Sequence, residues 1–66
     1  MEAEVYKVTS INERGAEVVT YVLPAARRMY SRMMLEEYGN VDAEGLLMAD
    51  APDSVQADFK KQTLSE

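Results

Sequence analysis

The sequence contains no cysteine and no histidine, so its 66 residues must fold without a disulfide and without the usual ligands of structural zinc. A domain of this length buries only about 60% of the surface that its unfolded chain exposes, and small domains usually add a disulfide, a metal or a partner subunit to that limited core. Association with another chain is the remaining means of stabilisation. We therefore expect a single small domain over residues 1–62, with a frayed tail at residues 63–66, that forms a homodimer.

The composition is that of a folded protein. Hydrophobic residues make up 47% of the chain and charged residues 29%, which is enough apolar material for a core and is unlike a disordered segment. The N-terminal stretch MEAEVYK begins acidic and lacks the apolar segment of a signal peptide, and no run approaches the roughly 20 apolar residues of a membrane span. Together with the absence of cysteine, these features predict a cytoplasmic protein with no membrane partner.

Two runs rich in β-branched and aromatic residues predict a β-hairpin. They are EVYKVTSI at residues 4–11 and AEVVTYVL at residues 16–23, and the link NERG supplies the Asn and Gly of a type I turn closed by a glycine bulge. Side chains of the second run alternate between two faces that are both largely apolar. One face should pack on a helix, and the other should be half exposed or covered by a second chain.

A helix is expected over residues 24–38, because Pro24 suits a first helical turn and Gly39 suits a left-handed cap. The apolar and aromatic residues of this segment follow the spacing of one buried stripe. Those expected to cover the sheet are Ala26, Met29, Tyr30 and Met33. Those that spread further around the helix, and are expected at a second contact, are Met34, Leu35 and Tyr38. Arg28, Arg32 and Glu36 form a charged row on another side.

The last third of the chain gives weaker signals. The apolar run at residues 46–49 predicts a third short strand, with a short helix as the alternative. Pro52 and Asp53 are typical of the first turn of a final helix that reaches about Lys61. The expected fold is therefore α+β: a β-hairpin followed by an amphipathic helix packed on it (ββα), a third short strand and a short C-terminal helix.

The residue types do not support enzymatic chemistry. Catalysis by a histidine base or a cysteine nucleophile is excluded, and no glycine-rich phosphate loop is present. The segment NVDAEGLLMADA at residues 40–51 imitates the ligand spacing of a calcium-binding EF-hand loop. However, Asn40 stands where Asp is expected and Ala51 where a bidentate Glu should close the site. We expect an acidic connection with a glycine turn, and no enzyme activity, cofactor or metal.

The net charge of −5 is unevenly distributed. Residues 1–35 hold five bases and four acids, whereas residues 36–66 hold two bases and eight acids. This split predicts a surface that is self-complementary or faces a basic partner. Arg27, Arg28 and Arg32 could contact nucleic-acid phosphates, but the net negative charge favours a solvated arginine face that pairs with the acidic half within the chain or across a dimer.

We expect a small, acidic, non-catalytic protein-binding module. Its layout, size, acidity and lack of catalytic side chains are similar to those of the small accessory proteins that phages and mobile elements encode to bind and inhibit host machinery, a similarity of architecture and size alone. Aromatic, arginine and apolar side chains dominate protein interfaces. The expected binding residues are Tyr21, Arg28, Tyr30, Arg32, Met34, Leu35 and Tyr38. The alternative is a nucleic-acid-related role, as an acidic DNA mimic or as a dimeric binder that uses the arginine helix.

Overall fold

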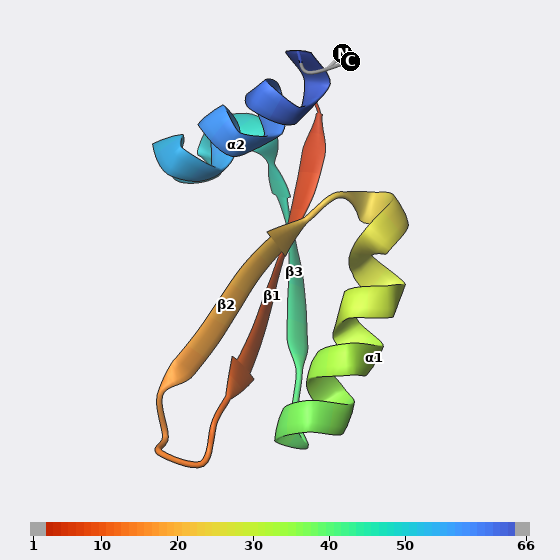
Figure 1. Ribbon diagram of the computed structural model, residues 1–66, viewed down its shortest axis with the longest axis vertical. Helices are drawn as coiled ribbons and strands as arrows, with labels where there is room; N and C mark the ends of the chain where they lie inside the picture. The colour runs from red at the N-terminus through yellow and green to blue at the C-terminus, as the bar shows by residue number, and fades with distance from the viewer. Residues whose placement is uncertain (1–2, 65–66) are drawn as a thin grey trace.

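The computed structural model describes the backbone of residues 3–64 and the side chains of residues 3–61. Its elements are, in order, β1 (Glu4–Ile11), β2 (Glu17–Val22), the 3₁₀ turn η1 (Pro24–Ala26), α1 (Arg27–Tyr38), β3 (Asp42–Leu47), the 3₁₀ turn η2 (Met48–Asp50) and α2 (Asp53–Leu64). The strands form one antiparallel sheet in the order β2-β1-β3. Figure 1 shows α1 running beside the sheet and α2 lying across one end of it. The predicted α+β fold is confirmed.

The hairpin turn forms as predicted. The backbone N–H of Gly15 donates to the carbonyl oxygen of Asn12 at 2.9 Å, and Gly15 has a φ of 80°, in the left-handed region that glycine adopts without strain. The side-chain oxygen of Asn12 accepts hydrogen bonds from the backbone N–H groups of Arg14 and Ala16 at 2.9 and 3.1 Å. Asn12 therefore fixes the turn from within, and the resulting register sets Ile11 opposite Glu17.

The long helix also begins and ends as predicted. Pro24 opens a single 3₁₀ turn that leads into α1. Gly39 ends the helix with a φ of 79°, and its N–H donates to the carbonyl oxygen of Leu35 at 2.8 Å. α1 packs mainly on β1 and less on β3. The centre of the core between helix and sheet is formed by Val8, Val22 and Met34.

The side of α1 that faces the sheet differs from the predicted one. Met29 and Met33 were expected to cover the sheet, but their side chains are 56% and 53% exposed, whereas Met34 is only 6% exposed. The helix residues that pack on the sheet instead follow steps of four: Ala26, Tyr30, Met34 and Tyr38. Four residues rotate an α-helix by about 400°, which is about 40° more than one full turn. A line of residues in steps of four therefore winds slowly around α1 and can follow the twist of the sheet.

The third strand is longer than predicted and begins earlier. It was expected at residues 46–49, but β3 starts at Asp42, and residues 48–50 form the turn η2. Asp, Glu and Gly have low strand propensity, yet pairing with β1 supplies backbone hydrogen bonds and sets Glu44 directly opposite Lys7. Residues 42–47 are consequently extended, and no EF-hand loop forms there.

The final helix begins at Asp53, as expected, and continues to Leu64, beyond the predicted end near Lys61. The tail expected to fray includes residues 65 and 66, which lie outside the described residues. Within residues 3–64, no helix is both long enough and apolar enough to cross a lipid bilayer.

Candidate protein-binding site

The two faces of the sheet are covered to different extents. Val8 points toward α1 and is fully buried. Val5, nearer the start of β1, points to the opposite face and is also fully buried, at the end of the sheet where α2 lies (Figure 1). Val55 and Phe59 of α2 line a hollow there together with Tyr21 of β2. The second helix therefore covers one end of the face opposite α1 and leaves the other end open.

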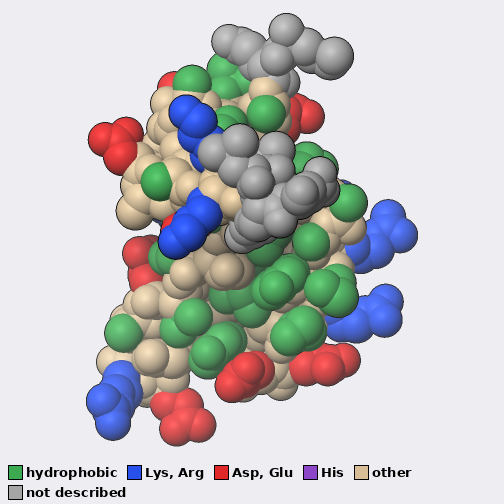
Figure 2. All heavy atoms as spheres, turned by 45° about the horizontal axis from the view of Figure 1, so that its top comes forward, with side chains coloured by type: hydrophobic (Ala, Val, Ile, Leu, Met, Phe, Trp, Pro, Cys, Tyr) green, Lys and Arg blue, Asp and Glu red, His purple; other side chains and the backbone are tan. Residues whose placement is uncertain are grey.

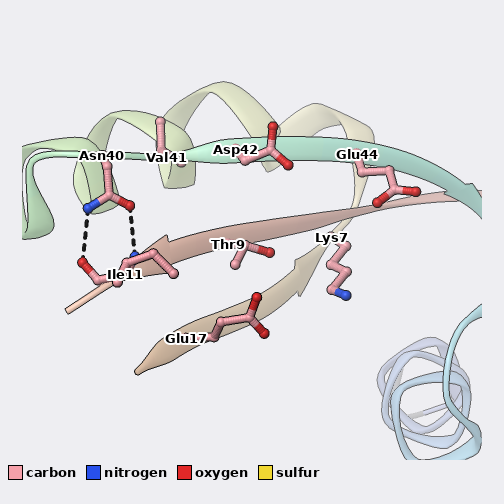
Figure 3. Close-up of a pocket in the computed structure, with 8 residues that line it drawn as sticks. All are labelled: Lys7, Thr9, Ile11, Glu17, Asn40, Val41, Asp42 and Glu44. Carbon is pink, nitrogen blue, oxygen red and sulfur yellow. Dashed lines mark hydrogen bonds between the residues drawn. The ribbon is translucent and has the colours of Figure 1, made fainter. Parts of the chain in front are cut away.

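We call this uncovered part the open sheet face. Its residues come from all three strands and are Lys7, Thr9, Ile11, Glu17, Val19, Asp42 and Glu44. Its apolar members are exposed, Ile11 to 42% and Val19 to 39%. Most of these residues, with Asn40 and Val41 at the edge, line an open hollow of about 410 Å³, which Figure 3 shows from close by.

The open sheet face is acidic. Glu17, Asp42 and Glu44 contribute three exposed carboxylates, and Lys7 contributes the single positive charge (Figure 3). In the strand register Lys7 lies opposite Glu44, and Thr9 lies opposite Asp42. Opposite charges on facing residues favour the pairing of neighbouring strands, but the three carboxylates still outnumber the one lysine. The face consequently combines exposed apolar side chains with an excess of negative charge.

Asn40 fixes the edge of this face. Its side-chain nitrogen donates to the carbonyl oxygens of Ile11 and Tyr38, at 2.9 and 3.1 Å, and its side-chain oxygen accepts from the N–H of Ile11 at 2.7 Å (Figure 3). The hydroxyl of Ser10, which is only 1% exposed, donates to the backbone carbonyl of Asn40 at 2.7 Å. The connection between α1 and β3 is thus tied to the end of β1. Asn40, which stands at the first ligand position of the EF-hand-like segment, therefore has a structural role.

The outer side of α1 is a second exposed surface. Met29 and Met33 lie one helical turn apart, and the exposed charged side chains near them belong to Arg28, Arg32 and Glu36. Figure 2 shows hydrophobic side chains gathered into a band beside this helix, with basic and acidic side chains at its borders. We call the surface made by these five residues the α1 outer side.

Arg27 is engaged within the chain. Its guanidinium carbon lies 4.9 Å from the centre of the Tyr6 ring, within the range of a cation–π interaction. The same ring fills the space beside Gly45, where an added Cβ would lie 3.2 Å from a Tyr6 ring carbon. Arg28 and Arg32 make no ion pair with a carboxylate of the described residues. The internal pairing between arginines and acids that the charge split allowed is therefore not found in this part of the chain.

The residues predicted to bind a partner are not gathered on one surface. Arg28 and Arg32 lie on the α1 outer side, and Leu35, which is 49% exposed, lies beside them because it follows Arg32 by three residues and Arg28 by seven. Tyr30 and Tyr38 are half-buried against the core, and Met34 lies within it. Tyr21 lies on the face opposite α1, beside α2.

Sequence reasoning missed several exposed residues of both surfaces. Met29 and Met33 were assigned to the core, and Ile11, Glu17 and Glu44 were not selected at all. For the methionines a signal existed in the sequence. The series in steps of four that contains both tyrosines of the helix runs through Met34, and it does not include Met29 or Met33. The open sheet face has no such signal, since its extent depends on where α2 docks.

Within the described residues, no group of three or more acidic side chains is close enough together to hold a metal ion. No model of a known protein family, no curated protein and no solved structure matches this chain. A function must therefore be inferred from the surfaces of the molecule itself.

Proposed function

We propose that the protein is a small non-catalytic protein-binding module whose open sheet face takes a positively charged segment of a partner protein. The observation that carries this proposal is the incomplete cover of the sheet. α2 closes one end of the face, while Ile11 and Val19 remain 42% and 39% exposed beside three carboxylates. Apolar side chains next to charged ones are the usual composition of a non-obligate protein interface.

The charge of the face defines the partner. Glu17, Asp42 and Glu44 outnumber the single Lys7, so a basic segment is attracted during approach and an acidic one is repelled. Tyr21, at the border with α2, supplies an aromatic side chain of the kind that contributes most to binding energy. The backbone of the face is held by two strand ladders and by Asn40, so little ordering entropy is lost on binding.

A module of this kind acts by occupying a surface of its partner, and it inhibits or modulates that partner without chemistry of its own. This mode of action agrees with the similarity in size and architecture to accessory proteins of phages and mobile elements. That part of the proposal depends on the similarity alone.

The experiment compares two double variants with equal net charge. Glu17→Gln with Glu44→Gln removes two acids of the open sheet face, and Glu13→Gln with Asp50→Asn removes two exposed acids elsewhere. Proteins captured from a cell lysate by the wild type are identified by quantitative mass spectrometry, and the affinity of the captured protein is measured by calorimetry. We expect the first variant to bind at least about tenfold more weakly and the second to bind like the wild type. Equal binding by both variants would contradict the proposal.

The nucleic-acid alternative has less support. Arg27 is stacked on Tyr6, and the remaining arginines of α1 share their row with Glu36. The described acids are spread over the hairpin, the open sheet face, the end of α1, η2 and α2, so they do not form the dense array that a DNA mimic needs. A nucleic-acid binder would shift labelled duplex DNA with an affinity that falls steeply as salt rises. A mimic would capture a nucleic-acid-binding protein, and added DNA would displace it.

A further inference from the structure

Two methionines of α1 are more exposed than any other large hydrophobic residue among the described side chains. Met29 is 56% exposed and Met33 is 53% exposed, and the two lie one turn apart on the α1 outer side. Methionine side chains are unbranched and adapt their shape to a partner. Each such exposed residue is ordinary alone, but an adjacent pair on one helix forms a continuous apolar strip.

The charges of α1 oppose its helix dipole. The helix has no acidic residue in its first turn and no basic residue in its last turn. Instead Arg27 and Arg28 stand at the positively polarised N-terminus, and Glu36 and Glu37 stand near the negatively polarised C-terminus. Arg28 and Arg32 are also one turn apart and repel each other. This order of charges destabilises an isolated helix.

Contacts within the chain do not compensate for this order. The Arg27 side chain meets the Tyr6 ring, but Arg28 and Arg32 have no carboxylate partner among the described residues. Met29 and Met33 have no cover from the sheet, because the packed line of the helix passes through Met34. Among the described residues, the exposed strip and the unpaired row of charges therefore lie side by side on one surface of α1.

We propose that a second copy of this chain packs on the α1 outer side, with the two helices antiparallel about a two-fold axis beside Arg32. Antiparallel packing sets Arg28 of each copy opposite Glu36 of the other, because the two residues lie equally far from Arg32 along the helix. Met29 and Met33 of both copies meet in the middle. The basic half of each helix then faces the acidic half of the other. The two helix dipoles also point in opposite directions, which is a favourable arrangement.

The distribution of charge favours a second copy over other occupants. The chain carries a net charge of −5, yet α1 holds three arginines and two glutamates. Two copies that meet through α1 approach by a side that is not acidic, whereas contact through the open sheet face would bring carboxylates together. The two ends of this row are complementary across a two-fold axis, because Arg28 faces Glu36 of the other copy at both ends, whereas the two Arg32 side chains meet at the axis and repel each other. This contact does not involve the open sheet face, so it goes beyond the proposed function.

An exchange of charges tests the arrangement directly. The Arg28→Glu variant places a glutamate opposite Glu36 of an identical copy, and the Glu36→Arg variant places an arginine opposite Arg28. We expect each variant alone to dimerise at least about tenfold more weakly than the wild type in sedimentation equilibrium at low salt, equivalent to about 1.4 kcal/mol. An equimolar mixture carries the same total charge as the wild type and restores opposite charges at both positions. We expect the mixture to form heterodimers of near wild-type affinity.

A second pair of variants tests the apolar strip. Met33→Asp buries a carboxylate in the proposed contact and should also weaken the dimer, whereas Leu47→Asp makes the same kind of change at an exposed leucine of β3, outside α1, and should leave the dimer intact. A monomeric wild type at millimolar concentration, a mixture that stays monomeric, or equal effects of the two Asp variants would each overturn the proposal. The Met33→Asp substitution lies outside the open sheet face, so it should not affect the capture of a basic partner. The proposed function and the proposed dimer can therefore be tested independently.

Discussion

Asn40 shows how one side chain can join three elements of the fold. It hydrogen-bonds the N–H and the carbonyl of Ile11 at the end of β1 and the carbonyl of Tyr38 at the end of α1. It therefore holds the helix end, the start of β3 and the rim of the open sheet face together. Aspartate cannot replace it, because two of these three bonds need the amide N–H groups.

We predict that Asn40→Ala lowers the free energy of unfolding by about 1–3 kcal/mol, because three backbone groups lose their partners, one of them part-buried. Urea denaturation of the wild type and the variant measures the difference. Asn40→Asp keeps the acceptor for Ile11 N–H but sets a carboxylate against two carbonyl oxygens, so it should be no more stable than Asn40→Ala. A change of less than about 0.5 kcal/mol in both variants would show that the contacts of Asn40 do not contribute to stability.

At the scale of elements, the charges on the outer side of α1 lower the stability of the isolated helix. We predict that Arg28→Glu raises the stability of the monomer by about 0.5–1 kcal/mol. The variant places an acid in the first turn, removes the repulsion with Arg32 and creates a Glu–Arg pair one turn apart. The measurement is thermal unfolding in the Met33→Asp background, so that association does not contribute. A less stable monomer would mean that Arg28 is retained for a contact inside the chain.

Local sequence signals were sufficient to predict the hairpin, α1 and the order of the elements. The turn residues Asn12 and Gly15 and the helix boundaries Pro24 and Gly39 act through their own backbone preferences, so they can be recognised without the rest of the fold. The start of β3 at Asp42 could not be recognised, because its acids and glycine disfavour a strand until β1 supplies hydrogen-bond partners. The rotation of α1 was missed for the same kind of reason, since the twist of the sheet selects which helix line packs.

At the scale of the molecule, the candidate sites were only partly predictable. Arg28 and Arg32 could be expected on the surface from charge alone. The open sheet face could be expected only as a general possibility, because a hairpin with two apolar faces must leave or cover one of them. Its actual extent follows from the docking of α2 over Val5 and beside Tyr21, and a helix pattern carries no information about where a helix will dock.

The small core makes the stability of the whole molecule sensitive to association. The hydrophobic residues buried within the described part of the chain are Val5, Val8, Val22, Met34 and Ala51. A core of this size gives a domain only marginal stability, so a dimer contact should contribute a measurable share of it. Because dimerisation stabilises by mass action, we predict that the melting temperature of the wild type rises by about 5–10 °C over a hundredfold increase in protein concentration.

The matched variants separate this effect from aggregation. Met33→Asp should melt at a temperature that does not depend on concentration, whereas Leu47→Asp should retain the dependence of the wild type. Circular dichroism in cells of different path length covers the concentration range. If Met33→Asp and the wild type show the same dependence, the chains associate through another surface, and the reversed charges of α1 would then have to meet a different protein. If the wild type shows none, the core of the single chain is sufficient, and the methionine strip is left free for a partner.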